Sequence, residues 1–517
     1  MSAPLAPAQT QPEAAGAGQA VREVDVFEYI VRGNTVLDAR SIERAVTPFL
    51  GPHKTLKDIE DARDALQAAY QSGGYQSVHV ELPEQQVTEG VVFLQVSETR
   101  VGRVRVVDNK YTSPRDVREQ VPSLKEGDVP NFTQAQAELT EINRSGKRQV
   151  VPLVREGTLP GTMDVDLKVD DNSPWHASLG LNNDKSADTD ELRLSATVSH
   201  DNLWQLGHSA SISFYGTPQD FTQSKTWSGA YIAPLPKSQW SLELSAMKSD
   251  SDVATVGGTT VLGKGQQFGL KGTYTVPDTT PWLHSFSVGV DFKDNKERTQ
   301  LGQGGDEIPL QYAPITLDYS GFNQTERSQL QLGLQLVAGT RSFLGFGSSS
   351  DEFDAKRFKS SPSFMVLKGD TSGSLTFQNN SQLGFRLGGQ LTDSPLISSE
   401  QFSIGGMSSV RGYLQAENTG DAGFSASIEM RTRPFAWSAV YLENARLYAF
   451  IDAGYVRTRE PLAEQQDMTR LASVGVGTSF RLSSYVNGQI DLGYPLRNGA
   501  RTERYEPRLN FNLNASY

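Results

Sequence analysis

The C-terminal two-thirds of the chain alternates between apolar and polar residues with a period of two. The last segment shows the pattern most clearly. Its apolar positions are Leu509, Phe511, Leu513, Ala515 and Tyr517, and its polar positions are Arg508, Asn510, Asn512, Asn514 and Ser516. Successive side chains of a β-strand point to opposite faces, so this pattern predicts a strand with one apolar and one polar face. Many such strands in succession restrict the fold to a β-sandwich or a β-barrel.

The spacing of these segments favours a membrane β-barrel over a soluble β-sandwich. From Trp175 onward there are about sixteen segments of about ten residues, joined alternately by short and long connectors, as in bacterial outer-membrane barrels. Their polar faces carry Arg, Glu, Asn and Gln, which suits a hydrated lumen. The fold class predicted for residues 172–517 is therefore a membrane β-barrel of about 16 antiparallel strands, wide enough to hold an aqueous channel.

The composition agrees with this fold and excludes several others. The 517-residue chain has no cysteine, which rules out disulfides, thiolate metal sites and a cysteine nucleophile. Its mean hydropathy is -0.43, and it has no apolar run of about 18 residues that could form a spanning helix. A closed barrel can still cross a bilayer, because closure satisfies every backbone N–H and C=O. The formal net charge of -12 argues against nucleic acid as a partner.

Residues 1–22 are interpreted as a flexible N-terminal lead. The stretch Met1–Ala20 is rich in Ala, Pro, Gln and Gly, and it lacks the basic region and apolar core of a signal peptide. We interpret the chain as a mature sequence to which an initiator Met was added. The sequence leaves open whether the lead forms a helix that plugs a pore.

Residues 23–98 and 99–171 are predicted to form two copies of one α/β domain. The first copy is predicted to contain a strand (Val24–Val31), a helix (Ala39–Leu50), a second helix from the capping box Thr55-Leu56-Lys57-Asp58 to Gly73-Gly74, and two strands (Gln76–Leu82 and Val91–Val96). The second copy is predicted to repeat this order, over Arg103–Val107, a helix from Ser113-Pro114, a helix from Phe132 to Gly146, Arg148–Arg155 and Thr162–Val169.

Two short motifs lie within the predicted barrel. The first is Gly405-Gly406-Met407-Ser408-Ser409-Val410-Arg411-Gly412-Tyr413, in a long connector over residues 392–420. The second is Tyr448-Ala449-Phe450-Ile451-Asp452-Ala453-Gly454, in a predicted strand. The glycines of the first motif allow the connector to turn sharply and to approach the barrel wall closely.

These features together resemble the TpsB transporters of two-partner secretion, the ShlB/FhaC/HecB type of the outer-membrane translocase superfamily. Val410-Arg411-Gly412-Tyr413 is similar to the family's VRGY/F tetrad. The second motif is similar to the family's F-x-x-x-D-x-G pattern, with Tyr448 in place of Phe, Phe450 inside the motif, and Asp452 and Gly454 at matching positions. The order β-α-α-β-β, present twice, is that of polypeptide-transport-associated (POTRA) domains.

The resemblance implies an outer-membrane protein that exports a partner polypeptide. The POTRA domains would lie in the periplasm, recognise the unfolded partner exoprotein and pass it to the barrel pore. The connector 392–420 would fold into the lumen, where Arg411 needs a carboxylate partner. Asp452 on the inner wall can supply one through a bidentate pair. The alternative is an exposed loop arginine and an ordinary lumen aspartate.

The expected partners follow from the same resemblance. An extended client segment is expected to add a strand at the exposed edges of the POTRA sheets, along Gln76–Leu82 and Arg148–Arg155. The barrel is expected to contact outer-membrane lipid and, during biogenesis, the barrel assembly machinery, because the aromatic Tyr517 resembles the C-terminal assembly signal. The protein is expected to be a monomer. The sequence does not identify the client.

No catalytic constellation, cofactor motif or metal-ligand spacing is evident, and the six histidines are scattered along the chain. We therefore expect a transporter and not an enzyme, with no cofactor and no metal. The main alternative is an outer-membrane protein insertase of the same superfamily, which usually carries more POTRA domains. A passive porin is a further alternative, although it needs neither the POTRA pair nor the loop motif.

Overall fold

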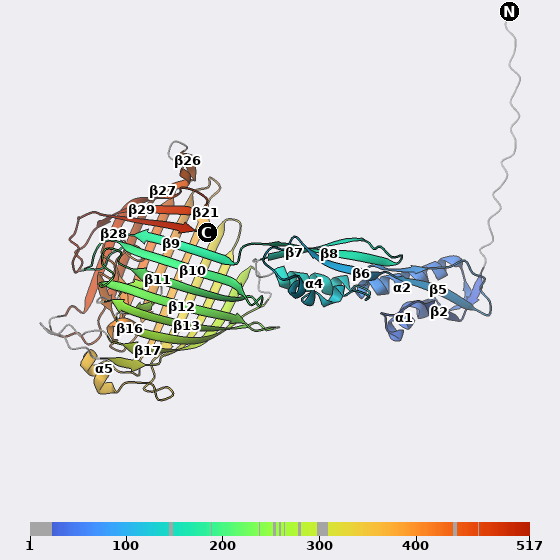
Figure 1. The fold of residues 1–517 in the computed structure, drawn as a ribbon, viewed down its shortest axis with the longest axis horizontal. Coiled ribbons are helices and arrows are strands. Elements are labelled where there is room, and N and C mark those ends of the chain that lie inside the picture. The colour runs from blue at the N-terminus through green and yellow to red at the C-terminus, as the bar shows by residue number, and fades with distance from the viewer. Residues whose placement is uncertain are drawn as a thin grey trace, which may run out of the picture. The chain divides into compact units, whose positions relative to one another are not determined.

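A computed structural model describes residues 23–143, 148–187, 189–236, 238–251, 255–257, 260–262, 264–277, 281–296, 309–437, 442–463 and 465–517. The predicted lead 1–22 and the helix end at Gly146 lie outside the described residues. The chain divides into two compact units, Met1–Ser173 and Pro174–Tyr517, which are α/β and all-β in structure, respectively (Figure 1).

The first α/β domain has the predicted order of elements around a three-stranded sheet. Its main elements are β2 (Glu28–Arg32), α1 (Ala39–Val46), the 3-10 turn η1 (Thr47–Phe49), α2 (Leu56–Ser72), β4 (Val78–Glu81) and β5 (Val91–Glu98). The sheet order is β2-β5-β4, in which β2 runs parallel and β4 antiparallel to β5.

The strand predicted over Val24–Val31 is divided in the structure. The backbone N–H groups of Phe27 and Glu28 both donate to the carbonyl oxygen of Gly90, at 2.8 and 3.2 Å. This contact separates β1 (Val24–Val26), which pairs with β3 (Gly51–Lys54), from β2. One continuous strand was therefore the wrong expectation, because the local pattern does not show that its two halves join different sheets.

Helix α2 begins and ends where its sequence predicts. Asp58 accepts from the backbone N–H of Thr55 at 2.8 Å and donates its own N–H to the Thr55 hydroxyl, which completes the capping box. The helix ends at Gly73, and Gly74 follows with φ +90°. A Cβ on Gly74 would lie 2.2 Å from the side-chain oxygen of Asn131, so this end accepts only glycine.

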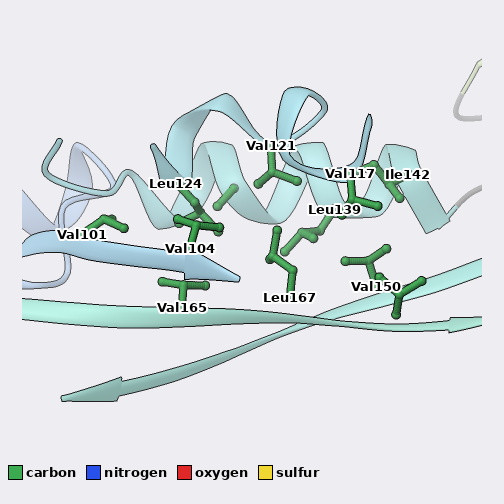
Figure 2. Packing of buried hydrophobic residues seen from close by; sticks show 12 residues of the cluster. Val101, Val104, Val117, Val121, Leu124, Leu139, Ile142, Val150, Val165 and Leu167 are labelled. Atoms are coloured by element: carbon green, nitrogen blue, oxygen red, sulfur yellow. The ribbon is translucent and has the colours of Figure 1, made fainter. Parts of the chain in front are cut away.

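The second α/β domain repeats the order and has an apolar core between its helices and sheet (Figure 2). Its elements are β6 (Arg100–Val107), α3 (Pro114–Glu119), the 3-10 turn η2 (Pro122–Leu124), α4 (Phe132–Asn143), β7 (Arg148–Glu156) and β8 (Thr162–Asp171). The sheet order is β6-β8-β7. The fully buried core residues include Val117, Val165 and Leu167.

The two α/β domains share part of their interior. Val129, which precedes α4 of the second domain, packs in the core of the first domain with Leu66 and Tyr70. The backbone N–H of Phe132 donates to the carbonyl oxygen of Gly74 at 2.8 Å, and the side chain of Asn131 donates to that of Gly73 at 2.9 Å. The boundary near residue 99 therefore separates two sheets, each with its own apolar cluster, and Val129 crosses it.

The second unit is a closed antiparallel β-barrel, so the sandwich alternative is wrong (Figure 1). Its sixteen strands are β9 (Trp175–Asn182), β10 (Arg193–Leu203), β11 (His208–Gly216), β12 (Ser224–Pro234), β13 (Trp240–Ser251), β16 (Gly265–Thr275), β17 (Trp282–Asn295), β19 (Ile315–Gln324), β20 (Ser328–Ala338), β21 (Met365–Thr376), β22 (Gln382–Leu391), β25 (Ala422–Arg431), β27 (Leu442–Arg457), β28 (Met468–Arg481), β29 (Val486–Pro495) and β30 (Arg508–Ser516). The last strand, β30, pairs with the first, β9.

Shorter elements accompany the ring. The strand pieces β18 (Leu310–Tyr312) and β26 (Phe435–Trp437) lie along it, β14 (Thr255–Gly257) pairs with β15 (Thr260–Leu262), and helix α5 (Ser350–Lys356) lies in the β20–β21 connector. No helix among the described residues has the length and apolar character needed to cross a bilayer.

The alternation of the strands places their apolar residues on the outside, as predicted. In β27, Leu447 and Ile451 are exposed on the outer face, whereas Phe450 and Asp452 are buried inside the ring. The same arrangement recurs in β29, where Ile490 and Leu492 face outward and Asp491 is buried inside. An outer face of this kind matches a lipid environment, and the polar inner face matches a lumen.

The connector between β22 and β25 forms a hairpin. It contains the 3-10 turn η3 (Ser398–Glu400) and the paired strands β23 (Phe402–Ile404) and β24 (Asn418–Gly420). We call residues 402–420 the arm, and residues 405–417 its tip. The motif around Arg411 therefore lies at the tip of the arm.

Candidate functional site

The arm packs against the inner face of the barrel wall. Ile404, Val410 and Tyr413 of the arm form a buried apolar cluster with Val456 of β27 and Leu471 of β28. Both wall residues are at inward positions of their strands, since Val456 has the parity of Asp452 and Leu471 is paired with Gly454. The arm therefore lies inside the barrel, as expected for residues 392–420.

The guanidinium of Arg411 is fully buried and forms a bidentate pair with Asp452. Its Nε lies 2.8 Å from Asp452 Oδ2 and its Nη2 lies 2.9 Å from Oδ1. The backbone N–H of Arg411 also donates to Oδ2, at 3.0 Å. The structure thus brings together the two residues that the sequence motifs had paired, and the exposed-loop alternative for Arg411 is wrong.

Three further wall residues complete the environment of Arg411. Nη1 lies 2.8 Å from Glu429 Oε2 and 3.5 Å from Asp491 Oδ1, and Nη2 donates to the Ser427 hydroxyl at 3.1 Å. The sequence analysis missed these residues. Their inward parity in alternating strands was visible, but the pairing of β25 with β27 and of β28 with β29 was needed to place them beside Asp452.

The aromatic residues of the second motif have separate roles. The guanidinium carbon of Arg411 lies 3.4 Å from the ring centroid of Phe450, which gives a cation–π contact. Tyr448 does not bond Arg411, and its hydroxyl donates to Asp491 at 2.5 Å. Phe450 therefore contacts the arginine directly, whereas Tyr448 orients a neighbouring carboxylate.

Four glycines let the tip lie against the wall. Gly405, Gly406 and Gly412 have φ values of +110°, +90° and +91°, in the region that favours glycine. A Cβ on Gly412 would lie 3.1 Å from the backbone of Gly493 in β29. A Cβ on Gly454 would lie 3.1 Å from methyl carbons of Ile404 and Val410. The motif glycines therefore make the close contact between arm and wall possible.

Another tetrad residue, Tyr413, joins the tip to strand β28 and to the β29–β30 connector. Its hydroxyl lies 2.9 Å from the carbonyl oxygen of Ala472 and 2.8 Å from that of Arg497. Two neighbouring connectors also hold the tip. Asp184 accepts from the N–H of Met407 at 3.2 Å, and Glu417 accepts from the N–H of Thr502 at 2.7 Å.

Tyr517 lies at the seam where the barrel closes. Its backbone N–H donates to Ala177 at 2.8 Å and its carbonyl accepts from Ala177 at 3.1 Å, which extends the pairing of β30 with β9. Its ring is exposed and stacks with Tyr485, with centroids 6.2 Å apart. A role as an assembly signal stays a prediction.

The edge strands of the α/β sheets, β4 and β7, are partly covered by side-chain amides. Gln67 of α2 donates to the carbonyl of Val78 and accepts from the N–H of Val80, both at 2.7 Å. Asn143 of α4 accepts from the N–H of Val150 at 2.6 Å and donates to its carbonyl at 3.0 Å. Each amide thus occupies hydrogen-bonding positions of the edge that an added strand would use.

The open part of the β7 edge begins after this amide. Pro152 has no N–H and occupies the same parity as Val150, as expected on the free side of an edge strand. Val154 has this parity too, and its side chain is 47% exposed. The side chains of Val151 and Leu153, on the opposite face of the strand, are exposed as well. Among the described residues, no group of three or more His, Asp or Glu side chains could hold a metal ion.

The chain matches the family model "Haemolysin secretion/activation protein ShlB/FhaC/HecB" over residues 161–480 and the ShlB-type POTRA domain over residues 24–99. It is 23% identical over 484 residues to the outer membrane transporter CdiB of Dickeya dadantii, which is 90% of this chain and 81% of that protein. It is 19% identical over 482 residues to the heme/hemopexin transporter protein HuxB of Haemophilus influenzae, or 90% and 82% of the two chains.

Solved structures share the fold. CdiB from Escherichia coli superposes with a TM-score of 0.59 at 19% identity, over 98% of this chain and 93% of CdiB. BamA from Haemophilus ducreyi lacking POTRA domains 1–3 superposes with a TM-score of 0.56 at 15% identity, over 96% and 100% of the chains.

Two POTRA domains followed by a sixteen-stranded barrel with an arm in its lumen define an outer-membrane transporter with periplasmic POTRA domains. The family model covers more than half of the chain. The protein therefore belongs to the haemolysin secretion/activation family ShlB/FhaC/HecB, whose members export partner exoproteins.

Proposed function

We propose that this transporter exports its partner exoprotein through the barrel lumen after the arm has left the position described above. The observation that carries the proposal is the fully buried Arg411, which ties the arm tip to the wall through Asp452. These ion pairs lie inside the barrel lumen, so breaking them would free the arm tip from the wall. Arg411 and Asp452 together act as the latch, and Gly405, Gly406 and Gly412 allow the tip to seat.

The barrel-wall motif supports the latch. Phe450 stacks on the guanidinium, Tyr448 orients Asp491, and Gly454 leaves room for the arm. Losing one partner of a buried ion pair costs about 3–5 kcal/mol, because the other partner keeps a buried charge. Removal of Arg411 leaves Asp452, Glu429 and Asp491 close together, and mutual repulsion of these carboxylates adds to the effect.

The test is co-expression with a secreted partner. The substitution Arg411→Ala is expected to impair export while the barrel still assembles, as judged by its heat-modifiable mobility on a gel. Lys359→Ala is the matched control, because Lys359 forms an exposed ion pair with Glu460 at 2.9 Å, and neither residue bonds Arg411 or Asp452. Normal export by the Arg411→Ala variant would remove the proposed role of the arm.

Client recognition is proposed to use the POTRA edges, and most of all the open half of β7. An extended client segment would bond the backbone of Pro152 and Val154 and cover the exposed side chains of Val151 and Leu153. The part of the edge Arg148–Arg155 that is available to a client is shorter than expected, because Asn143 already bonds the N–H and the carbonyl of Val150. Along the edge Gln76–Leu82, Gln67 already bonds the carbonyl of Val78 and the N–H of Val80, so a client could bond only the remaining backbone groups.

A proline substitution tests this edge with little disturbance of the fold. Val154→Pro removes the outward N–H, whereas pairing with β8 uses the other parity, and Pro152 already tolerates proline. Export is expected to fall in Val154→Pro and to persist in the control Val154→Ala, which keeps the N–H. Equal export by the two variants would show that backbone bonding at β7 is not used.

The insertase alternative makes a different prediction. BamA shares the fold, but the matched family and the relatives CdiB and HuxB are transporters by name. Deletion of an insertase impairs assembly of other barrels, whereas deletion of this protein is expected to abolish export of one partner.

We further propose the domain limits 1–22, 23–98, 99–171 and 172–517, a monomeric state, and Tyr517 as the residue read by the barrel assembly machinery.

A further inference from the structure

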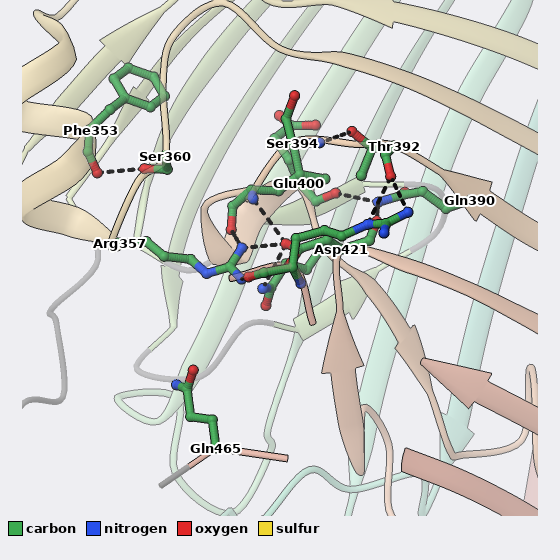
Figure 3. A network of polar contacts seen from close by, with 12 residues as sticks. Phe353, Arg357, Ser360, Gln390, Thr392, Ser394, Glu400, Asp421 and Gln465 are labelled. Atoms are coloured by element: carbon green, nitrogen blue, oxygen red, sulfur yellow. Dashed lines mark hydrogen bonds and ion pairs between the residues drawn. The ribbon is translucent and has the colours of Figure 1, made fainter. Parts of the chain in front are cut away.

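A second set of buried charges lies at the base of the arm, apart from the Arg411 latch (Figure 3). Asp421, which directly follows β24, is fully buried. Its carboxylate accepts from both terminal guanidinium nitrogens of Arg357, one of them at 2.7 Å. It also accepts from the backbone N–H of Leu396 at 2.9 Å and of Arg459 at 2.6 Å. One carboxylate thus receives donors from three connectors.

The two arginines extend these contacts. Arg357, in the β20–β21 connector, also donates to the carbonyl oxygens of Leu396 and Arg459. Arg459, in the β27–β28 connector, donates to the carbonyl of Thr392 at 3.2 and 3.0 Å. Residues on both sides of the arm are therefore tied to the same pair of neighbouring connectors.

A second carboxylate holds the other side of the base. Glu400 of η3 is 2% exposed. It lies 2.6 Å from the Lys293 ammonium and 3.8 Å from that of Lys368, and it accepts from the Tyr312 hydroxyl at 2.8 Å. Gln390 then donates to the backbone carbonyls of Glu400 and Asp421, both at 2.9 Å, so one side chain joins the two sides (Figure 3).

An apolar cluster shields these charges from water. It contains Leu310, Tyr312, Val337, Phe353, Phe364, Val366, Leu396 and Ile397. Ion pairs shielded in this way are stronger than exposed pairs, and removing one partner is more damaging. The base is therefore held mainly by two shielded carboxylates, whereas the tip combines the Arg411 guanidinium with apolar packing, close glycine contacts and hydrogen bonds to two neighbouring connectors.

We propose that Asp421 and Glu400 are positioning residues that clamp the base of the arm, so that only residues 402–420 swing when the pore opens. Arg411 holds the tip of this moving segment, and Asp421 and Glu400 fix the point about which the segment turns. The two anchors share no side chain, so their effects are expected to be separable. This inference rests on the proposed function, in which the arm moves during export.

Site-directed spin labels on the full chain separate the clamp from the latch. The chain has no cysteine, so a single Ser408→Cys at the tip or Asp393→Cys at the base is labelled without background. Arg411→Ala is expected to mobilise the label at position 408 and to leave that at 393 unchanged. Asp421→Asn and Arg357→Met are expected to mobilise the label at 393. Lys359→Ala, which breaks an exposed pair between the same two connectors, is expected to change neither.

Planar-bilayer conductance of the same variants gives the functional readout. Arg411→Ala is expected to raise the open probability by roughly a hundredfold or more, the lower end of the factor that corresponds to loss of one buried ion-pair partner. Arg411→Ala combined with Asp421→Asn and Glu400→Gln is expected to reach the larger conductance of a chain lacking residues 392–420, because the latch and both carboxylates of the clamp are then lost. Heat-modifiable mobility confirms that each variant forms a barrel.

Two outcomes would overturn the clamp. The first is an unchanged label at 393 in both Asp421→Asn and Arg357→Met. The second is a triple variant, Arg411→Ala with Asp421→Asn and Glu400→Gln, whose conductance equals that of Arg411→Ala alone. Failure of the proposed function looks different, since Arg411→Ala would then export its partner normally while the labels still report separate anchors.

Discussion

The periplasmic POTRA unit and the barrel are stabilised in opposite ways. The POTRA cores consist of residues such as Leu66, Val165 and Leu167, which are fully buried among other apolar side chains. The barrel interior instead buries charged residues such as Arg411, Asp452 and Asp491 beside two small apolar clusters, while most apolar side chains of its strands face outward. This protein therefore relies on apolar packing in its POTRA unit, and largely on hydrogen-bonded charge where the arm meets the wall, the contact that we propose is released during export.

The difference is physically useful because the two kinds of contact respond differently to small changes. Apolar packing is non-directional and tolerates substitution by side chains of similar volume. A bidentate guanidinium–carboxylate pair depends on geometry, so a small displacement breaks it. The first kind of interior suits a domain that stays folded, and the second suits an arm that is released.

The largest effect is expected from a cavity in the POTRA unit. Leu167→Ala removes a fully buried side chain, and such changes cost about 2–5 kcal/mol. Hydrogen exchange of the full chain in detergent should show lower protection in the POTRA unit, with the barrel unchanged. Equal loss of protection in both units would show that the POTRA unit and the barrel are not stabilised independently.

An intermediate effect is expected from a substitution that keeps the charge of the latch. Arg411→Lys retains a cation but loses the fork that bonds Asp452 and Glu429. Loss of one hydrogen bond to a charged group costs about 1.5–3 kcal/mol, so channel open time should rise measurably in planar bilayers. The POTRA counterpart Leu167→Met should have little effect. A silent Arg411→Lys would mean that charge alone holds the arm.

The smallest effect concerns pH and Asp171, a buried carboxylate at the end of β8 in the second POTRA domain. Burial of Asp171 raises its pKa, but hydrogen bonds from the backbone N–H groups of Lys110, Tyr111 and Thr112 outweigh this and leave the pKa below its usual value. A lowered folded-state pKa stabilises the domain above the unfolded pKa, and this stabilisation is lost as the pH falls through the folded value.

Thermal unfolding of the POTRA unit should therefore become easier at acidic pH, and Asp171→Asn should reduce this dependence. The control is Asp170→Asn, which changes a neighbouring carboxylate outside these backbone bonds. A pH profile that is identical in both variants would show that Asp171 does not contribute.

Much of this architecture was predictable because its signals are local or periodic. The alternation in residues 508–517 predicted a barrel strand, and the capping box at Thr55 predicted the start of α2. The pairing of Arg411 with Asp452 was expected from the resemblance to the transporter family and from the need of a lumen arginine for a carboxylate. The helix start at Pro114 was predicted from a single residue with a fixed φ.

The remaining features depend on contacts between distant parts of the chain. Glu429 and Asp491 reach Arg411 only because strands β25, β27, β28 and β29 are neighbours in the closed ring. The pair of Lys293 with Glu400 joins residues 107 positions apart. The amides of Gln67 and Asn143 reach their edge strands from helices, so no strand pattern indicated that the edges are partly covered.

Val129 has a consequence for experiments that shorten the periplasmic part. This residue belongs to the second POTRA domain by sequence but fills space in the interior of the first. A truncation that removes only the second domain would leave a cavity in the core of the first domain and expose the end of α2 at Gly74. Loss of export after such a truncation would thus report damage to two domains at once, and point substitutions on β7 give a cleaner answer about which one meets the client.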